Sequence, residues 1–425
     1  MSVHSGSEGE IRSGRLALLR DFRLLVYLFI AFRLLLLIVY QPILMGDTER
    51  GVSAGGDLSY FHGLGALADR GLLPFRDYWS EFPPIWPAMY VLVAQITESG
   101  GQPNYTAFAS VMGLIMLAFD TGNLILLRRI GERLHGRDTG LALAWIYAVL
   151  LAPAVFLWWT FETMVAFWLL LGLWGLVREQ DGRSALAAAV GGLTKFVPLI
   201  LLGVVWRFRD WRSALRYTGI ALGVFALVYL GLIAATGQMG AASLVAQFGK
   251  SSYSTVWALI DGNYTTGVFG PVESRLDPAA ATVPVGNPAV IPSWLRLVVF
   301  GGIGLFAFWR TRRRDAQGVV AFTLLTLLIF FLWAQGWSPQ WLVLLIPLIL
   351  LCFPERGGVL IVLLLSLIAF TEYPLLFIRT GDTGGVIAGP LRTPFVVLVL
   401  VRTAILAGLA FVLYRRLRAP TVEDR

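Results

Sequence analysis

Four carboxylates lie close together in one polar interval of an otherwise apolar chain. The stretch 55–87 reads "GGDLSYFHGLGALADRGLLPFRDYWSEFPPIWP" and carries Asp57, Asp69, Asp77 and Glu81. A carboxylate in such an interval can belong to a functional site. Because apolar residues follow Asp57 at helical spacing, the alternative is a helix N-cap, and periodicity alone favours that role about two to one.

Four further charged residues lie within or beside long apolar runs: Arg33, Asp120, Glu162 and Lys195. A charge at the centre of a bilayer costs at least about 2.5–3.5 kcal/mol, so such residues usually face a cavity or a partner. For Arg33 and Asp120, a buried ion pair between packed helices and a role in ligand binding are equally favoured.

Lys195 stands in the segment "GGLTKFVP", where two glycines and a proline weaken the helix. Broken helices of this kind can present a cation and free backbone groups to an anion. This favours a functional role for Lys195, and the alternative is a side chain that extends to the membrane interface.

Two later segments add polar and aromatic groups. The loop at 237–292 is too long for a simple connection and is typical of a lid or a binding loop. The segment "WAQGWSPQWLVLLIPLIL" places Trp337 and Gln340 at a turn between two apolar runs, where we expect them in the wall of a pocket.

The sequence gives no support for a dedicated metal or nucleotide site. His4, His62 and His135 are far apart, and Cys352 is the only cysteine. The "GKS" at 249–251 lacks the upstream glycines of a phosphate-binding loop. We expect no cofactor, and a divalent metal ion at the acidic interval stays an open alternative.

Composition places this chemistry in a membrane. The 425 residues are 57% hydrophobic and 14% charged, with a mean hydropathy of +0.72, whereas about 25% of a soluble domain is charged. The formal charge of +8 comes from Arg clusters between apolar runs, which orient helices in a bilayer and do not indicate nucleic acid.

Runs of about 20 apolar residues predict an all-α, polytopic helix bundle of about twelve spans, with ten to thirteen possible. The candidate spans are 24–45, 84–98, 106–127, 139–158, 161–177, 185–206, 217–236, 293–310, 318–335, 339–353, 358–378 and 394–414. Twelve alternating spans put the basic segment 128–138 outside, against the positive-inside tendency. Ten full spans satisfy every basic segment if 84–98 and 185–206 are re-entrant or broken. We favour twelve.

The basic segments orient the chain. We predict a cytoplasmic segment 1–23, a single membrane domain 24–414 and a cytoplasmic tail 415–425. The loops at 46–84 and 237–292 are then extracytoplasmic, which puts Asp57 outside the cytoplasm.

The first external loop has a further pattern. Apolar residues of 58–68 recur at helical spacing, which predicts an amphipathic helix lying on the membrane surface. Tyr78, Trp79 and Trp86 follow at the depth expected of an interfacial aromatic belt.

The motifs "GLLPFRDYWSEFPP", "TKFVPLILL" and "SPQWLVLLIPLIL" occur in this order after an acidic residue that follows the first span. Together they resemble the polyprenyl-phosphate-sugar-dependent glycosyltransferases of the multi-spanning C class (GT-C), particularly the bacterial mannosyltransferases of family 87. The resemblance covers nearly the whole chain.

The resemblance implies a role for several residues. Asp57 is the expected general base, Lys195 and then Arg33 are the expected cations at the donor phosphate, and Tyr60 and Glu81 shape the sugar or acceptor site. Trp337 and Gln340 line the donor groove. It also implies a bacterial-type inner membrane enzyme with an extracytoplasmic site.

The implied reaction moves a sugar, expected to be mannose, from a polyprenyl-phosphate donor to a glycolipid, glycan or protein acceptor with inversion. Membrane lipids are the other expected partners. The alternative is a non-catalytic transporter or lipid flippase with Arg33, Asp120 and Lys195 in a polar pathway. A transporter would concentrate its polar residues at mid-membrane in related halves, whereas this chain collects acidic residues in its first loop and has no internal duplication.

Overall fold

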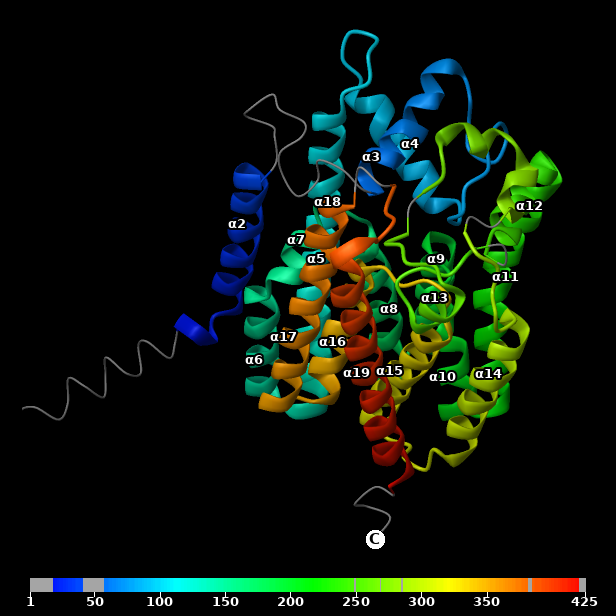
Figure 1. The fold of residues 1–425 in the computed structure, drawn as a ribbon. Coiled ribbons are helices and arrows are strands. Elements are labelled where there is room, and N and C mark those ends of the chain that lie inside the picture. The colour runs from blue at the N-terminus through cyan, green and yellow to red at the C-terminus, as the bar shows by residue number, and fades with distance from the viewer. Residues whose placement is uncertain are drawn as a thin grey trace, which may run out of the picture.

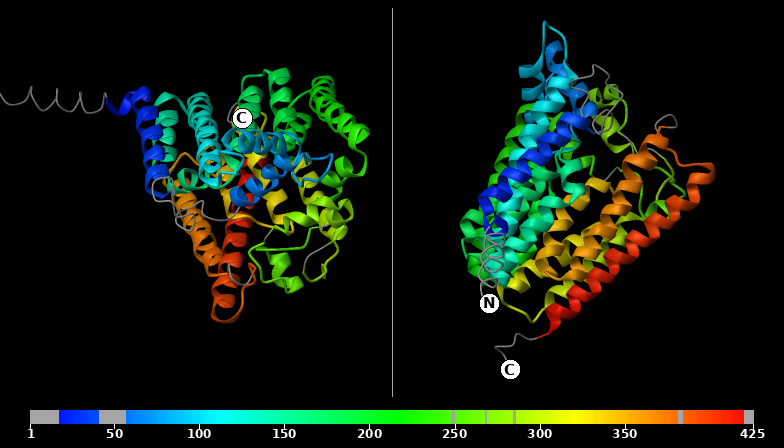
Figure 2. Two further views of the ribbon diagram at one scale, coloured as in Figure 1. Left: turned by 90° about the horizontal axis from the view of Figure 1, so that it is seen from above. Right: turned by 90° about the vertical axis from the view of Figure 1, so that its left-hand side faces the viewer.

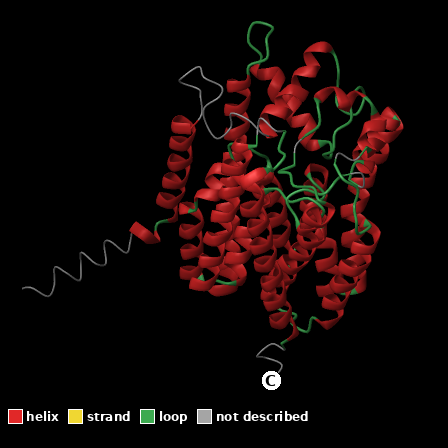
Figure 3. Ribbon diagram, viewed as in Figure 1, coloured by secondary structure: helices red, strands yellow, loops and turns green. Residues whose placement is uncertain are grey.

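The computed structural model describes residues 18–40, 57–247, 250–267, 269–283, 286–380 and 384–419. In this part of the chain every regular element is a helix (Figures 1 and 3). The α-helices are α2 (Phe22–Tyr40), α3 (Asp57–Gly65), α4 (Ile85–Thr97), α5 (Tyr105–His135), α6 (Arg137–Val149), α7 (Leu151–Phe156), α8 (Glu162–Val177), α9 (Asp181–Thr194), α10 (Leu201–Phe208), α11 (Trp211–Thr236), α12 (Gln238–Val245), α13 (Val256–Asp261), α14 (Ser293–Arg310), α15 (Ala316–Trp333), α16 (Leu342–Cys352), α17 (Arg356–Phe370), α18 (Phe377–Arg379) and α19 (Arg392–Arg418).

Among the described residues, six helices are long and apolar enough to cross a membrane. They are Tyr105–His135, Trp211–Thr236, Ser293–Arg310, Ala316–Trp333, Arg356–Tyr373 and Gly389–Arg418. Shorter apolar helices lie between them, so the chain is a multi-pass, all-α helix bundle, as the sequence predicts. The number of spans stays a prediction.

The basic segments gather at one end of the bundle, which we call the basic end. Gln317 donates from Nε2 to the carbonyl oxygen of Leu134 at 3.2 Å, and Arg416 donates to that of Cys352 at 2.8 Å. The segment 128–138 therefore lies beside the other basic segments, near the C-terminus (Figures 1 and 2). The strictly alternating arrangement that the sequence favoured is wrong for this segment, because it put 128–138 at the opposite end.

The α9–α10 segment explains how the basic segments come together. Arg209 donates from Nε to Asp181 at 3.0 Å, so the two ends of this segment meet. Between them the helix breaks at Lys195, whose backbone is extended (φ −158°, ψ 139°). The segment enters from the basic end and returns to it, which is the re-entrant alternative for 185–206, with Lys195 at its tip.

The predicted amphipathic helix exists as α3, but its apolar face does not lie on lipid. Leu58, Phe61 and Leu64 are buried, and the helix packs against α4. Protein covers this face because α4 is itself a short apolar helix at the same end of the bundle (Figure 1). The apolar face thus packs on protein and not on lipid, and the depth of the helix relative to the membrane surface stays a prediction.

The residues predicted to form an aromatic belt are buried in protein and do not face lipid. Trp86 stacks on Phe161 with ring centroids 4.2 Å apart. Trp79 donates from Nε1 to the carbonyl oxygens of Ser274 at 3.1 Å and Asp277 at 2.9 Å. These contacts attach the first loop to the bundle and to the long loop.

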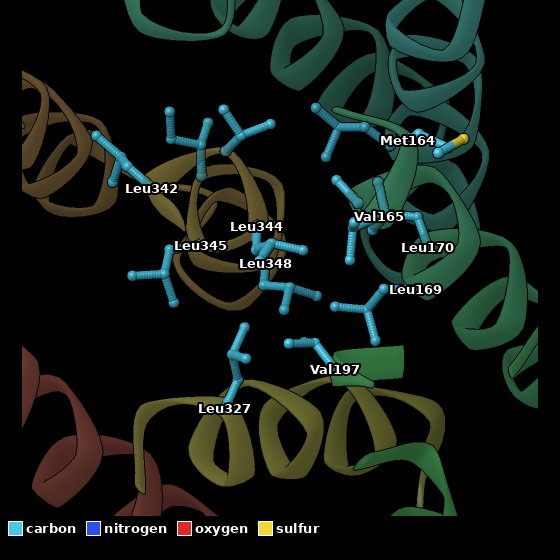
Figure 4. Packing of buried hydrophobic residues seen from close by; sticks show 14 of the residues in the cluster. Met164, Val165, Leu169, Leu170, Val197, Leu327, Leu342, Leu344, Leu345 and Leu348 are labelled. Atoms are coloured by element: carbon cyan, nitrogen blue, oxygen red, sulfur yellow. The ribbon is translucent and has the colours of Figure 1, made fainter. Parts of the chain in front are cut away.

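Helix α16 forms the centre of the bundle because it is apolar on every side. All of its residues from Leu342 to Leu351 are buried, as expected of a helix without a polar face. Figure 4 shows Leu344 and Leu348 of α16 facing Val165 of α8 and Leu327 of α15. This packing fixes the segment just before α16, which carries Trp337 and Gln340.

Arg33 and Asp120 form an ion pair away from the loops. Arg33 donates from Nε to Asp120 at 2.6 Å, and Tyr147 donates to the other carboxylate oxygen at 2.5 Å. Both charged side chains are fully buried where α2 meets α5 and α6. A phosphate could bind Arg33 only by displacing Asp120 from this buried pair.

Replacing Arg33 with methionine is expected to destabilise the protein by about 3–5 kcal/mol, because it leaves Asp120 buried without its partner. Thermal unfolding in detergent measures this loss. The control is Glu132→Gln, which removes an i,i+4 pair with Arg128 on the surface of α5 and should cost about 0.3–0.5 kcal/mol. Equal shifts for the two variants would show that the buried pair does not stabilise the fold.

Candidate active site

The long loop docks on the turn before α16 through Tyr253. Its backbone N–H donates to the carbonyl oxygen of Gln335 at 3.1 Å, and its own carbonyl accepts from the N–H of Trp337 at 3.1 Å. The Tyr253 ring lies against Gly267 and Gly336, where any side chain would collide with it. The two glycines therefore allow the loop to close over this end of the bundle.

Asp57 lies at the start of α3, where it is half-buried and lines a cavity together with residues of this loop. Its Oδ2 accepts a hydrogen bond from Nε2 of Gln340 at 3.0 Å. The two residues are 283 positions apart, and the packing of α3 and α16 brings them together. The charges of Glu162, Lys195 and Glu81 also act on the Asp57 carboxyl group.

These surroundings change the acidity of Asp57. Its pKa is raised from 3.8 to about 8, mainly by burial and also by Glu162 and Glu81, whereas Lys195 and the hydrogen bond from Gln340 lower it. The carboxyl is thus poised to gain or lose a proton near neutral pH. A group of this acidity suits general base catalysis.

Lys195 and Glu162 form an ion pair next to Asp57. Nζ of Lys195 lies 2.5 Å from Oε1 of Glu162, which is buried at the first turn of α8. The ammonium group also faces the rings of Phe82, Phe161 and Trp341 at 5.3–5.5 Å. Lys195 is therefore a cation beside Asp57, but its ion-pair partner is Glu162.

A second charged cluster surrounds Glu81. Its carboxylate lies 3.1 Å from Nζ of Lys250 and 3.9 Å from Arg275. Burial alone would raise the pKa of Glu81, but Lys250 and Arg275 outweigh it, so the pKa is lower than usual. Arg275 also donates to the hydroxyl of Tyr60 at 2.7 Å. Two positive charges from the long loop thus hold Glu81 ionised beside the site.

Asp57 lines a small cavity of about 40 Å³. Most of the other lining residues come from the long loop, the turn before α16 and the segment that follows α17, and they include Ser254, Ser338, Gln340 and Glu372. This volume exceeds the ~10–15 Å³ that one water molecule needs. In this closed arrangement the cavity has room for a water molecule or a small part of a substrate.

A larger apolar groove of about 550 Å³ lies between α14, α15 and α19, with the start of α13 above it. Phe306 and Phe411 border it and are more than half exposed at the surface of the bundle. The groove therefore opens sideways, towards the region that lipid would occupy.

An ion pair separates the groove from the cavity. Arg402 lines the groove, Glu372 lines the cavity, and the two side chains are paired and almost fully buried. Glu372 also accepts from Nε1 of Trp337 at 3.1 Å. The guanidinium of Arg402 lies 4.6 Å from the Trp337 ring and donates to the carbonyl oxygen of Ser254.

The structure brings together most residues that the sequence singled out. Asp57 and Gln340 are bonded, and Lys195 and Glu81 lie close enough to influence Asp57. Tyr60 joins through Arg275, and Trp337 borders the neighbouring groove. Arg33 lies elsewhere, paired with Asp120.

The sequence-based interpretation missed four charged residues: Lys250, Arg275, Glu372 and Arg402. Arg402 stands within an apolar run, so the rule that selected Arg33 also applies to it. Arg275 and Lys250 belong to the long loop, and no local pattern distinguishes them from surface residues.

No group of three or more metal-ligating side chains occurs in the described ranges. The other carboxylates at or near the cavity are Glu81, Glu162 and Glu372, and each of them faces a cation. A metal at Asp57 would thus draw on few free protein ligands.

Comparisons with known proteins give distant structural likenesses only. No protein-family model and no curated protein sequence matches the chain. The apo oligosaccharyltransferase of Archaeoglobus fulgidus is similar with a TM-score of 0.46 and 14% identity over 93% of this chain. The archaeal oligosaccharyltransferase AglB from Archaeoglobus fulgidus, in complex with an inhibitory peptide and a dolichol-phosphate, gives a TM-score of 0.42 and 13% identity over 93% of this chain. This chain spans 56% of the length of those structures.

Proposed function

We propose that this protein is a membrane glycosyltransferase of the GT-C type, which transfers a sugar from a polyprenyl-phosphate donor to an acceptor hydroxyl with inversion. The observation that carries the proposal is Asp57, a carboxyl with a pKa of about 8 that lines a cavity beside an apolar groove. The motifs that resemble family 87 support mannose as the sugar and a glycolipid, glycan or protein as the acceptor. The site is proposed to face away from the cytoplasm.

The proposed reaction is a single displacement. The acceptor oxygen attacks the anomeric carbon while Asp57 takes the hydroxyl proton. The bond between the anomeric carbon and the phosphate oxygen breaks, and its electron pair leaves with the polyprenyl phosphate. No covalent enzyme intermediate forms, so the configuration at the anomeric carbon inverts.

Lys195 acts on Asp57 in this proposal. Its charge favours the ionised carboxylate, whereas Glu162 and Glu81 oppose it. Lys195 lines neither the small cavity nor the apolar groove. Its role at the donor phosphate, as the resemblance implies, stays a prediction, which the Lys195 variant described in the Discussion tests.

Glu81, Tyr60 and Arg275 are proposed to position the acceptor. They form one hydrogen-bonded and charged cluster at the end of the bundle where the loops gather (Figure 3). An acceptor hydroxyl placed between this cluster and Asp57 would meet both the base and polar partners. Trp337 and Gln340 keep their proposed place on the donor side.

Purified protein is expected to transfer label from polyprenyl-phosphate sugars to components of a membrane lipid extract and to release polyprenyl phosphate. Thin-layer chromatography follows the sugar label, and phosphate staining of the same plate detects the released polyprenyl phosphate. The proposal includes no cofactor, so EDTA should leave the rate unchanged. Loss of transfer in EDTA would instead require a divalent metal. Movement of the donor across vesicles without any transfer would contradict the enzyme and favour a transporter or flippase.

A further inference from the structure

We infer that Arg402 is the residue that binds the phosphate of the lipid donor, and that Glu372 occupies this position until the donor displaces it. The inference rests on the proposed function, since it names the donor's binding site. It also assigns the donor lipid chain to the groove between α14, α15 and α19 (Figure 1).

The groove has the dimensions of a site for a long apolar chain. Arg402 and Tyr414 both line it, and they lie twelve positions apart in α19, which corresponds to ~18 Å at 1.5 Å per residue. This is more than half of the ~30 Å hydrocarbon core of a bilayer. Aromatic and aliphatic side chains such as Phe300, Phe306 and Leu406 form its walls.

The charge distribution selects a lipid with one anionic end. Arg402 is the only charged residue among the described residues that line the groove. It lies at the end where the groove meets the turn before α16, next to Trp337. A chain that fills the groove would place its headgroup at Arg402, and an arginine can donate two parallel hydrogen bonds to a phosphate.

Glu372 now occupies the position that this phosphate would take. It pairs with Arg402 and lines the cavity that contains Asp57. A phosphate that takes over Arg402 would release Glu372 and join the groove to the cavity. The attached sugar would then extend from Arg402 towards Asp57, which places the base and the leaving group at different walls of the site.

Two substitutions with opposite expected effects test this exchange. Arg402→Gln should weaken the binding of undecaprenyl monophosphate to the full-length protein by about tenfold or more, because it removes a charge-assisted hydrogen bond. Glu372→Gln should strengthen it, because the amide can still accept from Trp337 but no longer competes for Arg402. Native mass spectrometry of the detergent-solubilised protein measures both affinities.

The double variant Arg402→Gln/Glu372→Gln keeps the test valid if Arg402→Gln alone does not fold, because it leaves no buried charge without a partner. It should fold and still bind the lipid phosphate weakly. If the ion pair were only structural, the double variant would bind as tightly as the wild type, and that result would overturn the inference.

The ligand's chemistry is tested on the wild-type protein. Undecaprenol, which lacks the phosphate, should bind weakly and equally to the wild type and to Arg402→Gln. Equally tight binding of phosphatidylglycerol would overturn the assignment to an isoprenoid phosphate, and equally tight binding of inorganic phosphate would overturn the role of the groove. These binding measurements need no turnover. The donor site can therefore be confirmed even if sugar transfer is not observed, and transfer can be observed even if the donor site is overturned.

Discussion

Asp57→Asn is expected to lower the rate of sugar transfer by about a hundredfold to ten-thousandfold, the usual contribution of a general base. Asparagine has the size of aspartate and can still bond to Gln340, but it cannot accept the hydroxyl proton. Single-turnover transfer with excess protein over labelled donor measures the loss. Donor binding and thermal stability should stay close to those of the wild type, because the proton acceptor alone is removed.

Asp69→Asn is the matched control. Asp69 belongs to the same polar interval, but its carboxylate accepts from Gln95 at 2.6 Å and lines neither the cavity nor the groove. Transfer by this variant should stay near the wild-type rate. A rate for Asp57→Asn within a few-fold of the control would remove Asp57 from the chemistry.

Lys195→Met and Glu162→Gln are expected to move the pH dependence of transfer in opposite directions. The ionised form of Asp57 is the active base, so kcat/KM should rise with pH and level off above the pKa of about 8. Methionine at Lys195 removes a charge that lowers this pKa and leaves Glu162 without its partner. The rising limb should therefore move to higher pH.

At a pH below the pKa of Asp57, a tenfold weaker acid at this position is ionised in about one tenth as many molecules as in the wild type. The rate of transfer should fall in the same proportion. Glu162→Gln removes a charge that raises the pKa of Asp57, so its rising limb should move to lower pH. If Lys195→Met weakened donor binding and left the limb in place, Lys195 would belong to the phosphate site, as the family resemblance implies. Unmoved limbs in both variants would contradict the proposed control of Asp57.

Much of the helical architecture is predictable from the sequence because long apolar runs have few alternatives in a bilayer. The span proposed at 293–310 coincides with α14 (Ser293–Arg310). The glycines and the proline around Lys195 also predict the break that the structure shows there. These signals are local, and they depend on residues that are close in the chain.

Contacts between distant segments could not be predicted in this way. Periodicity identifies the apolar face of α3, but it does not say whether α4 or lipid covers that face. The hydrogen bond between Arg275 and Tyr60 joins residues 215 positions apart, and no spacing rule connects them. The same holds for Glu372 and Arg402, whose pairing depends on how the segment after α17 packs against α19.

The functional residues fall between these two cases. Asp57 and Gln340 were expected at the site on the strength of motifs, and the structure supplies the bond between them. Arg33 was selected as a charge within an apolar run, and the sequence could not show that Asp120 is its buried partner. The high cost of a charge inside a membrane segment identifies residues such as Arg33 and Asp120 from the sequence. Only the fold shows which of these charged residues contact one another.

The anomeric configuration of the product is the most direct test of a single displacement assisted by Asp57. A polyprenyl-phosphate sugar of known configuration, labelled with ¹³C at the anomeric carbon, would be incubated with purified protein and acceptor, and the product examined by NMR. Inversion, with polyprenyl phosphate as the other product, is the predicted result. Retention of configuration, or a donor that stays intact while both substrates are bound, would contradict it.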